Sequence, residues 1–301
     1  MSTLYILIGL QGSGKSFWAR WRALNNDNYI IVSSDEIRRI FNWEIDNDKV
    51  FNLFYEQINN GLKLGKNVIA DATNTTIKAR RQLFERVKVD CRKVGIWFNT
   101  PIEVCKKRLE ERNKAGTQNE VPLEALEKYH KGFQVPFYEE GFNLLFMTNS
   151  DVFNSEAYKA KKMEMYAFDQ KTKYHDFNLG FHCDLVESCL QKNGGFQLGL
   201  GSLHDIGKLF TQTIDENGQA HYYNHENVGA YYLGSHTELM PCDDPWELLF
   251  MVNYHMLPFG WKTDKALKKW TQIFGVDKVN KLLEFNKYDE FATKKINLEN
   301  F

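Results

Sequence analysis

Long apolar runs are missing from this sequence of 301 residues. No segment approaches the roughly 18 consecutive apolar residues that a membrane-spanning helix needs. The first residues, MSTLYILIG, also lack the basic start and the small-residue cleavage site of a signal peptide. We therefore expect a protein of the cytoplasm.

Paired cysteines are also missing. The chain has five cysteines and none of them forms a CxxC pair: Cys91, Cys105, Cys183, Cys189 and Cys242. An odd number without zinc-type spacing predicts reduced, mostly buried thiols.

Neither sign of charge is in excess. Lysine and arginine number 38, aspartate and glutamate 39, and the formal net charge is −1. A broad basic surface for nucleic acid is therefore not expected. A polynucleotide substrate would have to be held by a local basic groove, around one strand end.

The first part of the chain alternates between short apolar runs and amphipathic segments. This pattern predicts βα units, and therefore a parallel sheet with helices on both faces. The expected strands are 4–9, 29–35, 67–74, 93–98 and 143–148. The expected helices are 16–24, 36–41, 77–87, 102–113 and 123–133, with Ser34 or Asp35 capping the second.

The second part of the chain has a different composition. Seven of the eight histidines lie at or after position 175, and apolar residues recur there at helical spacing. Helices are expected at 182–191, 228–236, 245–255 and 279–292, and a hairpin or exposed loop at 213–223. We predict two domains, an α/β domain at 1–150 and a mainly α-helical domain at 151–301, joined in the polar segment around 150–165.

A phosphate-binding motif lies at residues 9–16, GLQGSGKS, after an expected strand and before an expected helix. Gly12 and Gly14 let the backbone turn its N–H groups toward phosphate oxygens. Lys15 can bridge the β- and γ-phosphates of ATP, and Ser16 can bind Mg²⁺. The sequence thus predicts a P-loop domain that binds ATP and Mg²⁺.

The acceptor of the phosphate is indicated by the next strand, which ends in SSDEIRR. Asp35 lies where open α/β sheets place their ligands, and it can accept a proton from an attacking hydroxyl. Arg38, one helical turn further, can hold an acceptor phosphate. The alternative for Asp35 is a plain helix cap. Asp71, in DATN at 71–74, can act on Mg²⁺ through water or can simply begin a polar loop.

Two arginines precede a polar segment, NKAGTQNEVP at 113–122, which we predict to be a loop or lid. Arg108 and Arg112 lie four residues apart on one helix face and can close over the transferring phosphoryl group. The alternative is a solvated helix face with Glu110 and Glu111.

These motifs together resemble the 5′-hydroxyl polynucleotide kinases of nucleic-acid end-healing systems, over roughly residues 1–148. The resemblance implies transfer of the ATP γ-phosphate to a 5′-OH end, and a location in the host cytoplasm if the chain is encoded by a phage. It implies Asp35 as general base, Arg38 as the contact to the terminal phosphodiester, and Arg108 and Arg112 as lid arginines. The predicted ATP-binding residues are Gly9, Gly12, Ser13, Gly14, Lys15, Ser16 and Arg108.

Metal ligands of the histidine and carboxylate types recur through the second part. LHDIGK at 203–208 places two adjacent ligands on an expected helix, with Lys208 facing the same way as His204 and able to hold a phosphate. Other candidates flank this motif on both sides: His182, His225, His255 and Asp289.

The order of these residues resembles the HD-domain metal phosphohydrolases, over roughly residues 165–295. The resemblance implies His182, His204, Asp205 and Asp289 as core ligands of Mn²⁺, Fe, Ni²⁺, Co²⁺ or Zn²⁺. His225 and His255 are expected to bind a second metal or the substrate, and the sequence does not separate the two. His175 is expected to contact substrate or to be structural.

A kinase joined to a phosphohydrolase suggests repair of broken nucleic acid. We expect a bifunctional enzyme that phosphorylates 5′-OH ends and removes 2′,3′-cyclic, 2′- or 3′-phosphates, with RNA or tRNA ends as substrate and a separate RNA ligase as partner. One alternative is a metabolite or nucleoside kinase fused to an HD nucleotide hydrolase. Another makes the HD part a regulatory nucleotide-binding module without turnover.

Overall fold

Two compact units make up the chain. The computed structural model describes residues 1–24, 26–116, 120–172 and 174–293. The first unit consists of Met1–Tyr129 and Pro136–Asn149, and the second of His130–Val135 and Ser150–Phe301. The second unit therefore includes a short segment that precedes the last strand of the first unit.

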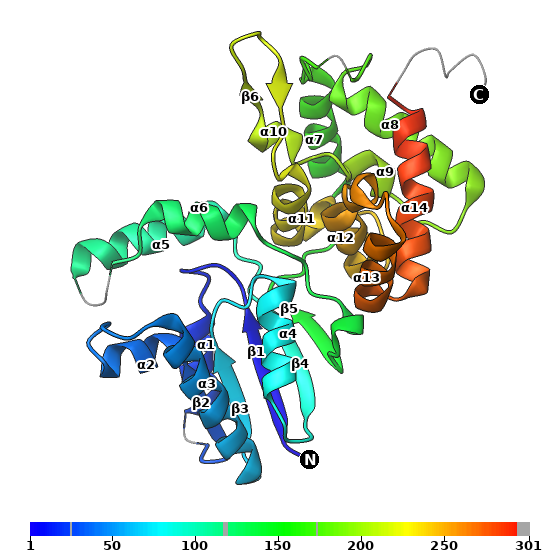
Figure 1. Cartoon of the computed structure of the whole chain (residues 1–301). Coiled ribbons are helices and arrows are strands. Elements are labelled where there is room, and N and C mark those ends of the chain that lie inside the picture. Colours follow the sequence, from blue (N-terminus) through cyan, green and yellow to red (C-terminus); the bar gives the residue numbers. More distant parts are fainter. Residues whose placement is uncertain (25, 117–119, 173, 294–301) are drawn as a thin grey trace. The chain divides into compact units, whose positions relative to one another are not determined.

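A five-stranded parallel sheet forms the centre of the first unit (Figure 1). Its strands, in spatial order, are β2 (Tyr29–Ser33), β3 (Asn67–Asp71), β1 (Thr3–Ile8), β4 (Arg92–Trp97) and β5 (Leu144–Met147). All four pairings between neighbouring strands are parallel. The carboxyl ends of the strands therefore meet at one edge, where sheets of this type bind their ligands.

Helices cover both faces of this sheet. The helices between the strands along the chain are α1 (Lys15–Ala23), α2 (Ser34–Ile40), α3 (Asn47–Lys63), α4 (Ile77–Arg86), α5 (Ile102–Ala115) and α6 (Leu123–Lys131), with a 3₁₀ turn at Tyr138–Glu140. On one face, Leu7 and Ile69 pack with Ala19 of α1. On the other face, α3 passes so close to β3 that a Cβ atom on Gly61 would lie 2.8 Å from Val68 Cγ2. The predicted doubly covered parallel sheet is confirmed.

Helix α3 was not expected, although the sequence carries its signals. Val50, Phe54 and Ile58 are spaced four residues apart and are buried, and the Asp46 side chain caps the helix by accepting from Lys49 N at 2.8 Å. The cap of α2 was assigned wrongly: it is Ser33, whose Oγ accepts from Glu36 N at 3.3 Å. Asp35 therefore lies inside the first turn of α2, and its interpretation as a helix cap is excluded.

A buried ion pair anchors the loop that follows β3. Arg80 donates to both carboxylate oxygens of Glu140 at 2.8 Å, and to the carbonyl of Asn74 at 3.0 Å. Asn74 in turn donates from Nδ2 to the Leu7 carbonyl at 2.8 Å. These bonds hold the loop after Asp71 beside the end of β1, where the phosphate-binding motif begins.

The second unit is mainly α-helical, as predicted. Its helices are α7 (Ser155–Ala167), α8 (Leu179–Asn193), α9 (Leu200–Leu203), α10 (Lys208–Thr211), α11 (His225–Ser235), α12 (Pro245–Tyr254), α13 (Asp264–Phe274) and α14 (Val276–Phe291), with 3₁₀ turns at Thr237–Leu239 and Leu257–Gly260. A two-stranded antiparallel hairpin pairs β6 (Thr213–Ile214) with β7 (Ala220–His221). The segment expected as a linker contains α7, which Asn154 caps by accepting from Glu156 N at 3.0 Å.

None of the described helices combines the length and the apolarity that crossing a membrane requires.

Candidate functional site

The phosphate-binding loop of the first unit connects β1 to α1. Gly12 and Gly14 have φ values of 78° and 101°, in the left-handed region that favours glycine. At Gly12 a Cβ atom would also lie 2.8 Å from the carbonyl oxygen of Cys105 in α5. The glycine pattern therefore has two local causes, the curl of the loop and its close packing against α5. Helix α1 begins at Lys15, so its N-terminal N–H groups face the space inside the loop.

Lys15 lies folded over the loop in the described structure. Its ammonium donates to the carbonyls of Gly9 and Leu10, at 3.0 and 2.7 Å, and lies 3.4 Å from Ser13 Oγ. Burial lowers the pKa of Lys15, and the neighbouring carboxylate of Asp71 partly offsets that effect. The side chain is therefore a preplaced cation at the centre of the motif.

Ser16 and Asp71 meet at the edge of the sheet. Asp71 ends β3 beside Ser33 of β2, is buried, and makes a side-chain hydrogen bond with Ser16. Burial raises the pKa of Asp71, while Ser16 and Lys15 counteract the shift. A hydroxyl and a carboxylate at this position are oxygen ligands of the kind that Mg²⁺ takes.

Asp35 and Arg38 form an ion pair on α2. Arg38 Nη1 donates to Asp35 Oδ1 at 3.1 Å, and Nη2 donates to Asn47 Oδ1 at 2.9 Å. The Asp35 side chain is 75 % exposed and that of Arg38 is 22 % exposed. Arg38 thus holds a fixed position, and Asp35 presents an accessible carboxylate beside it.

The two predicted lid arginines lie on α5. Arg108 donates from Nη1 to the Gly12 carbonyl at 3.2 Å, which places its guanidinium over the loop. Arg112 has a buried Nε without a hydrogen-bond partner among the described residues. Both arginines line the pocket of the motif; Arg108 is exposed to solvent and Arg112 is half-buried.

The polar segment expected to start at Asn113 begins later than predicted. Helix α5 continues to Ala115 and ends at Gly116, which has a φ of 60°. The Asn113 side chain donates to the Val121 carbonyl at 2.9 Å and ties the two ends of the segment together. The middle of the predicted lid, 117–119, lies outside the described residues.

A pocket of about 1140 Å³ opens in the first unit between the loop, α2, α3 and α5. Its lining includes the predicted residues Gly12, Gly14, Lys15, Ser16, Asp35, Arg38, Arg108 and Arg112, together with Asp71. Gly9 and Ser13 lie beneath it, as partners of the Lys15 ammonium. Sequence reasoning missed Arg20, Trp43, Asn47 and Gln57, which also line the pocket. Only Arg20 carried a signal, since it follows Ser16 by four residues on α1.

The HD motif of the second unit is not on a helix, contrary to expectation. Helix α9 ends at Leu203, α10 begins at Lys208, and His204 and Asp205 lie in the turn between them. A Cβ atom on Gly207 would lie 1.9 Å from the His225 carbonyl oxygen, so the turn packs directly against α11. This packing brings Asp205 to His225, two residues that the sequence separates by a hairpin.

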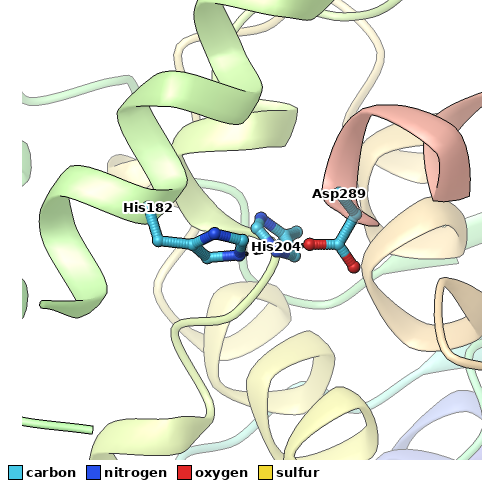
Figure 2. A group of neighbouring side chains, drawn as sticks. All are labelled: His182, His204 and Asp289. Carbon is cyan, nitrogen blue, oxygen red and sulfur yellow. Dashed lines mark ion pairs between the residues drawn. The ribbon is translucent and has the colours of Figure 1, made fainter. Parts of the chain in front are cut away.

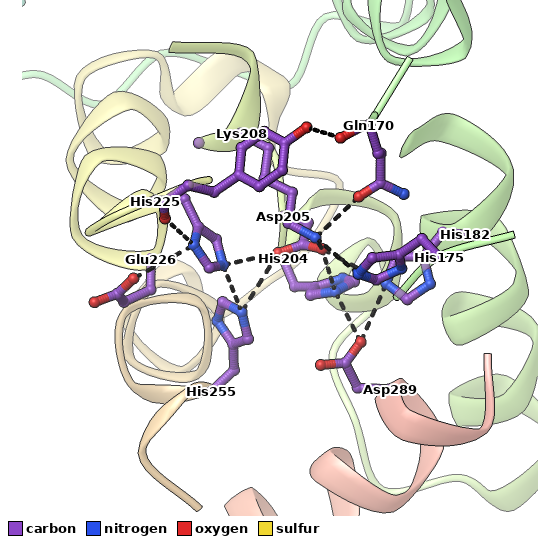
Figure 3. A network of polar contacts seen from close by, with 12 residues as sticks. Gln170, His175, His182, His204, Asp205, Lys208, His225, Glu226, His255 and Asp289 are labelled. Atoms are coloured by element: carbon purple, nitrogen blue, oxygen red, sulfur yellow. Dashed lines mark hydrogen bonds and ion pairs between the residues drawn. The ribbon is translucent and has the colours of Figure 1, made fainter. Parts of the chain in front are cut away.

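Asp205 lies between two pairs of histidines (Figure 3). Its Oδ2 atom lies 3.5 and 3.4 Å from the Nε2 atoms of His182 and His204. Its Oδ1 atom lies 3.0 and 3.5 Å from the Nε2 atoms of His225 and His255. Each carboxylate oxygen of Asp205 therefore faces its own pair of imidazole rings.

Asp289, which lies on α14, contacts the same two histidines, His182 and His204 (Figure 2). Its Oδ1 atom lies 3.1 Å from His182 Nε2 and 3.4 Å from His204 Nε2. All the side chains predicted as metal ligands in this unit are therefore gathered in one buried cluster: His182, His204, Asp205, His225, His255 and Asp289.

The four histidines of this cluster are oriented in the same way. Each Nδ1 atom faces a main-chain carbonyl, that of Ala292, Gly201, Tyr222 or Val252, at 2.8 to 3.1 Å. Such a bond fixes the ring and leaves Nε2 as the inward-facing atom.

The donor set fits a metal ion. Two groups have ligand atoms within 4.8 Å of one another, namely His182 with His204 and Asp289, and His204 with Asp205 and His255. The buried Nε2 atoms of His182 and His204 have no hydrogen-bond partner of good geometry among the described residues. Imidazole with carboxylate suits the divalent transition metals.

The ionisation of the cluster reflects its mixed charges. Burial opposes the charge on His182, but Asp205 and Asp289 outweigh it and raise the pKa of His182 to about 9. Burial acts likewise against the charges of Asp205 and Asp289, whose pKa values the surrounding cations hold well below the ordinary range.

Lys208 and His175 lie at the edge of the cluster. The Lys208 ammonium contacts Asp205 Oδ2 at 2.6 Å, Gln170 Oε1 at 3.0 Å and His175 Nε2 at 3.3 Å. Its three donor directions are thus all used by protein groups. Burial, together with the charge of Lys208, lowers the pKa of His175 to about 3, so that this ring is neutral.

Comparison with known proteins concerns the first unit most directly. Residues 4–136 match the family profile of an AAA domain. The first unit is a P-loop kinase-like domain. A search of curated proteins finds no match to the chain.

Three solved structures are similar to parts of the chain. One, from the Pnkp1/Rnl/Hen1 RNA repair complex, shares 27 % identity with a TM-score of 0.39 over 42 % of each chain. A fungal RNA kinase shares 16 % identity with a TM-score of 0.35, over 51 % of this chain and 40 % of that one. A gluconokinase from Sinorhizobium meliloti 1021 shares 15 % identity with a TM-score of 0.34, over 50 % of this chain and 84 % of that one. This chain therefore spans less than half the length of the first two.

Proposed function

We propose that the protein repairs RNA ends with two activities, one in each unit. The P-loop kinase-like unit phosphorylates 5′-OH ends with ATP. The helical unit, as an HD-domain phosphohydrolase, removes 2′,3′-cyclic, 2′- or 3′-phosphates with the help of a metal. The observation that carries the proposal is the presence, in one chain, of a phosphoryl-transfer pocket and a separate metal-type histidine cluster.

Phosphate binding in the kinase pocket follows from the loop geometry. The N-terminus of α1 and the loop N–H groups receive the triphosphate, and the Lys15 ammonium moves from the Gly9 and Leu10 carbonyls to its β- and γ-oxygens. Ser16 and Asp71, joined by a side-chain hydrogen bond, would hold Mg²⁺, which would supply charge neutralisation.

Transfer requires an activated hydroxyl opposite the leaving group. Asp35 accepts the proton of the acceptor hydroxyl while the new O–P bond forms, and the bond between the β,γ-bridging oxygen and the γ-phosphorus breaks to release ADP. Arg108 and Arg112 lie over the loop and stabilise charge on the transferring group.

The geometry next to Asp35 favours a polynucleotide acceptor. Arg38 is held at 2.9 Å by Asn47 and at 3.1 Å by Asp35, and in this proposal it binds the phosphodiester that follows the terminal nucleoside. A free sugar or nucleoside has no such phosphate. The pocket volume of about 1140 Å³ also exceeds the range typical of a site for one small ligand, so it has room for a nucleotide and an acceptor.

The helical unit contributes a metal centre in this account. His182, His204, Asp205 and Asp289 hold one divalent metal ion, which supplies Lewis-acid activation of the phosphoryl group and of water. The placement of His225 and His255 on the other oxygen of Asp205 supports their role as ligands of a second ion. Lys208, with all its donors engaged, serves to position Asp205 rather than to hold phosphate in the resting site.

RNA cleavage chemistry gives the reason for joining these activities. Many broken RNAs, including tRNAs, carry a 5′-OH on one side and a 2′,3′-cyclic phosphate on the other. Ligation generally requires the opposite, a 5′-phosphate and a 3′-OH. An enzyme with both activities converts the first pair of ends into the second, which a separate RNA ligase can seal.

Substrate comparison tests the proposal. Phosphorylation of 5′-OH oligonucleotides is compared with that of free nucleosides and sugar acids, under ATP and Mg²⁺. Preference for the small acceptors would identify a metabolite kinase instead. The purified protein is also analysed for bound transition metal and for phosphate release in added Mn²⁺, Ni²⁺, Co²⁺ or Zn²⁺. If it has neither, the helical unit is a binding module instead.

A further inference from the structure

The turn after α2 has an unusual backbone conformation. The helix ends in the common pattern in which Asn42 N–H donates to the Arg39 carbonyl at 3.1 Å and Trp43 N–H donates to the Arg38 carbonyl at 2.8 Å. That pattern needs one left-handed residue, and Asn42, with a φ of 49°, provides it. Trp43 has a φ of 65° as well, which the pattern does not require and which a bulky side chain rarely adopts.

The consequence of this conformation is the position of the indole. Trp43 lines the same pocket as Asp35 and Arg38, and the residue is 39 % exposed. Its backbone N–H is bonded to the carbonyl of Arg38, the residue whose guanidinium is fixed by Asp35 and Asn47. The strained turn thus leaves an exposed aromatic side chain in the pocket that is also lined by Arg38, the residue that would bind the acceptor phosphodiester. Backbone strain of this kind persists where it positions a functional group.

The chemistry of the pair matches single-stranded nucleic acid. Arginine binds the phosphodiester, and an adjacent aromatic face stacks on an unpaired base. We propose that Trp43 is the stacking platform for a base at the acceptor end, that of the first or second nucleotide. This inference rests on the proposed 5′-OH kinase activity and adds a specificity determinant to it: the kinase recognises an unpaired base in addition to the terminal phosphodiester.

Glycine offers a clean test, because it adopts a φ of 65° without strain and removes only the indole. KM and kcat are measured for Trp43→Gly, Trp43→Phe and the wild type. The acceptors are an intact 5′-OH RNA oligonucleotide and two versions that carry an abasic first or second nucleotide. Trp21→Ala is the matched control, since Trp21 is 64 % exposed and does not line the pocket.

For the wild type, one of the abasic acceptors should raise KM by roughly five- to a hundredfold, the range of base–aromatic stacking. Trp43→Gly should raise KM for intact RNA to the same extent and show no further rise with that abasic acceptor. Its KM for ATP and its kcat at saturating RNA should be unchanged. Trp43→Phe should recover part of the loss, and Trp21→Ala should match the wild type.

Two results would overturn the inference. One is a wild type whose KM is insensitive to both abasic positions, and the other is a Trp43→Gly enzyme that retains the wild-type KM and the full abasic effect. A wild type that phosphorylates no oligonucleotide is a different outcome, since it removes the proposed kinase function itself.

Discussion

Lys208 and Asp205 form a buried ion pair, with the ammonium 2.6 Å from the carboxylate oxygen that also faces His182 and His204. Both residues are at most 5 % exposed. The lysine therefore provides a fixed positive partner to a carboxylate that we propose as a metal ligand. Breaking a buried ion pair is costly because the remaining charge stays uncompensated.

Replacement of Lys208 by methionine should therefore destabilise the metal-free protein. We expect a loss of about 3 kcal/mol in the free energy of unfolding of the helical unit. The loss should shrink when Mn²⁺ is present, because the ion supplies the missing positive charge. Urea unfolding with and without Mn²⁺ measures both values. Lys159→Met, which removes an exposed partner of Glu156, is the control and should change little in either condition. An equal loss with and without metal would contradict the account.

The kinase pocket predicts a strict need for Asp35 and Lys15. Asp35→Asn should lower the rate of 5′ phosphorylation by about a hundredfold or more, because the amide cannot accept the hydroxyl proton. Lys15→Ala should reduce the rate to a similar extent by removing charge stabilisation of the phosphoryl group. Rates are measured by transfer of labelled phosphate from ATP to a 5′-OH oligonucleotide, with Asp48→Asn as an exposed control in the same unit. Near-normal turnover of Asp35→Asn would leave Asp35 as an ordinary surface carboxylate.

Arg112 should act mainly in the transition state. Its buried Nε has no partner among the described residues, so its donor is available to a phosphoryl oxygen. Arg112→Ala should lower kcat by about tenfold or more while KM for ATP changes little. Lys114→Ala, an exposed change on the same helix, should leave both constants unaltered. A larger effect on KM than on kcat would assign Arg112 to ground-state binding of ATP.

His182 makes the stability of the metal-free helical unit depend on pH. In the metal-free protein its folded pKa, about 9, lies above the ordinary value of 6.5. The charged imidazole therefore contributes stability below pH 6.5, and that contribution is lost as the pH rises through 9. Asp205 and Asp289, with lowered pKa values, contribute in the opposite direction: their stabilisation is lost as the pH falls below the ordinary value of 3.8.

Metal uptake must displace the proton from His182, since only the neutral imidazole binds a metal. Affinity for Mn²⁺ should therefore rise between pH 6.5 and 9, by up to about tenfold per pH unit for each proton released. Calorimetric titrations in two buffers with different ionisation enthalpies count the released protons. An affinity independent of pH, with no proton release, would contradict the proposed ligand role of His182.

Local sequence patterns were sufficient for the sheet and for most of the kinase helices. The alternation of apolar runs and the full GLQGSGKS motif predicted β1, the loop and α1, because the apolar run and the glycine spacing are local signals. The α3 helix was missed although its apolar spacing and Asp46 cap were visible. The interpretation of Asp35 as a cap failed because Ser33, two residues earlier in the chain, takes that role.

Long-range packing decided what the sequence could not. The HD motif lies in a turn between α9 and α10, where Ile206 N–H donates to the Leu203 carbonyl and Gly207 packs directly against α11. The same packing brings His225 to Oδ1 of Asp205, which His255 at the end of α12 also faces. The order of the residues in the sequence did not show this division of the ligands. Trp43 was also invisible in the sequence, because its position depends on a backbone conformation that its residue type does not favour.

We propose that one chain repairs both ends of a broken RNA at two independent sites. The most direct measurement incubates RNA that carries a 5′-OH and a 2′,3′-cyclic phosphate with ATP, Mg²⁺ and Mn²⁺, and analyses both ends. Wild type should produce a 5′-phosphate and a 3′ end free of phosphate. Lys15→Ala should lose only the first product and His204→Ala only the second, with circular dichroism confirming that both variants are folded. Release of phosphate from free nucleotides but not from RNA, or loss of both products in either variant, would contradict the account.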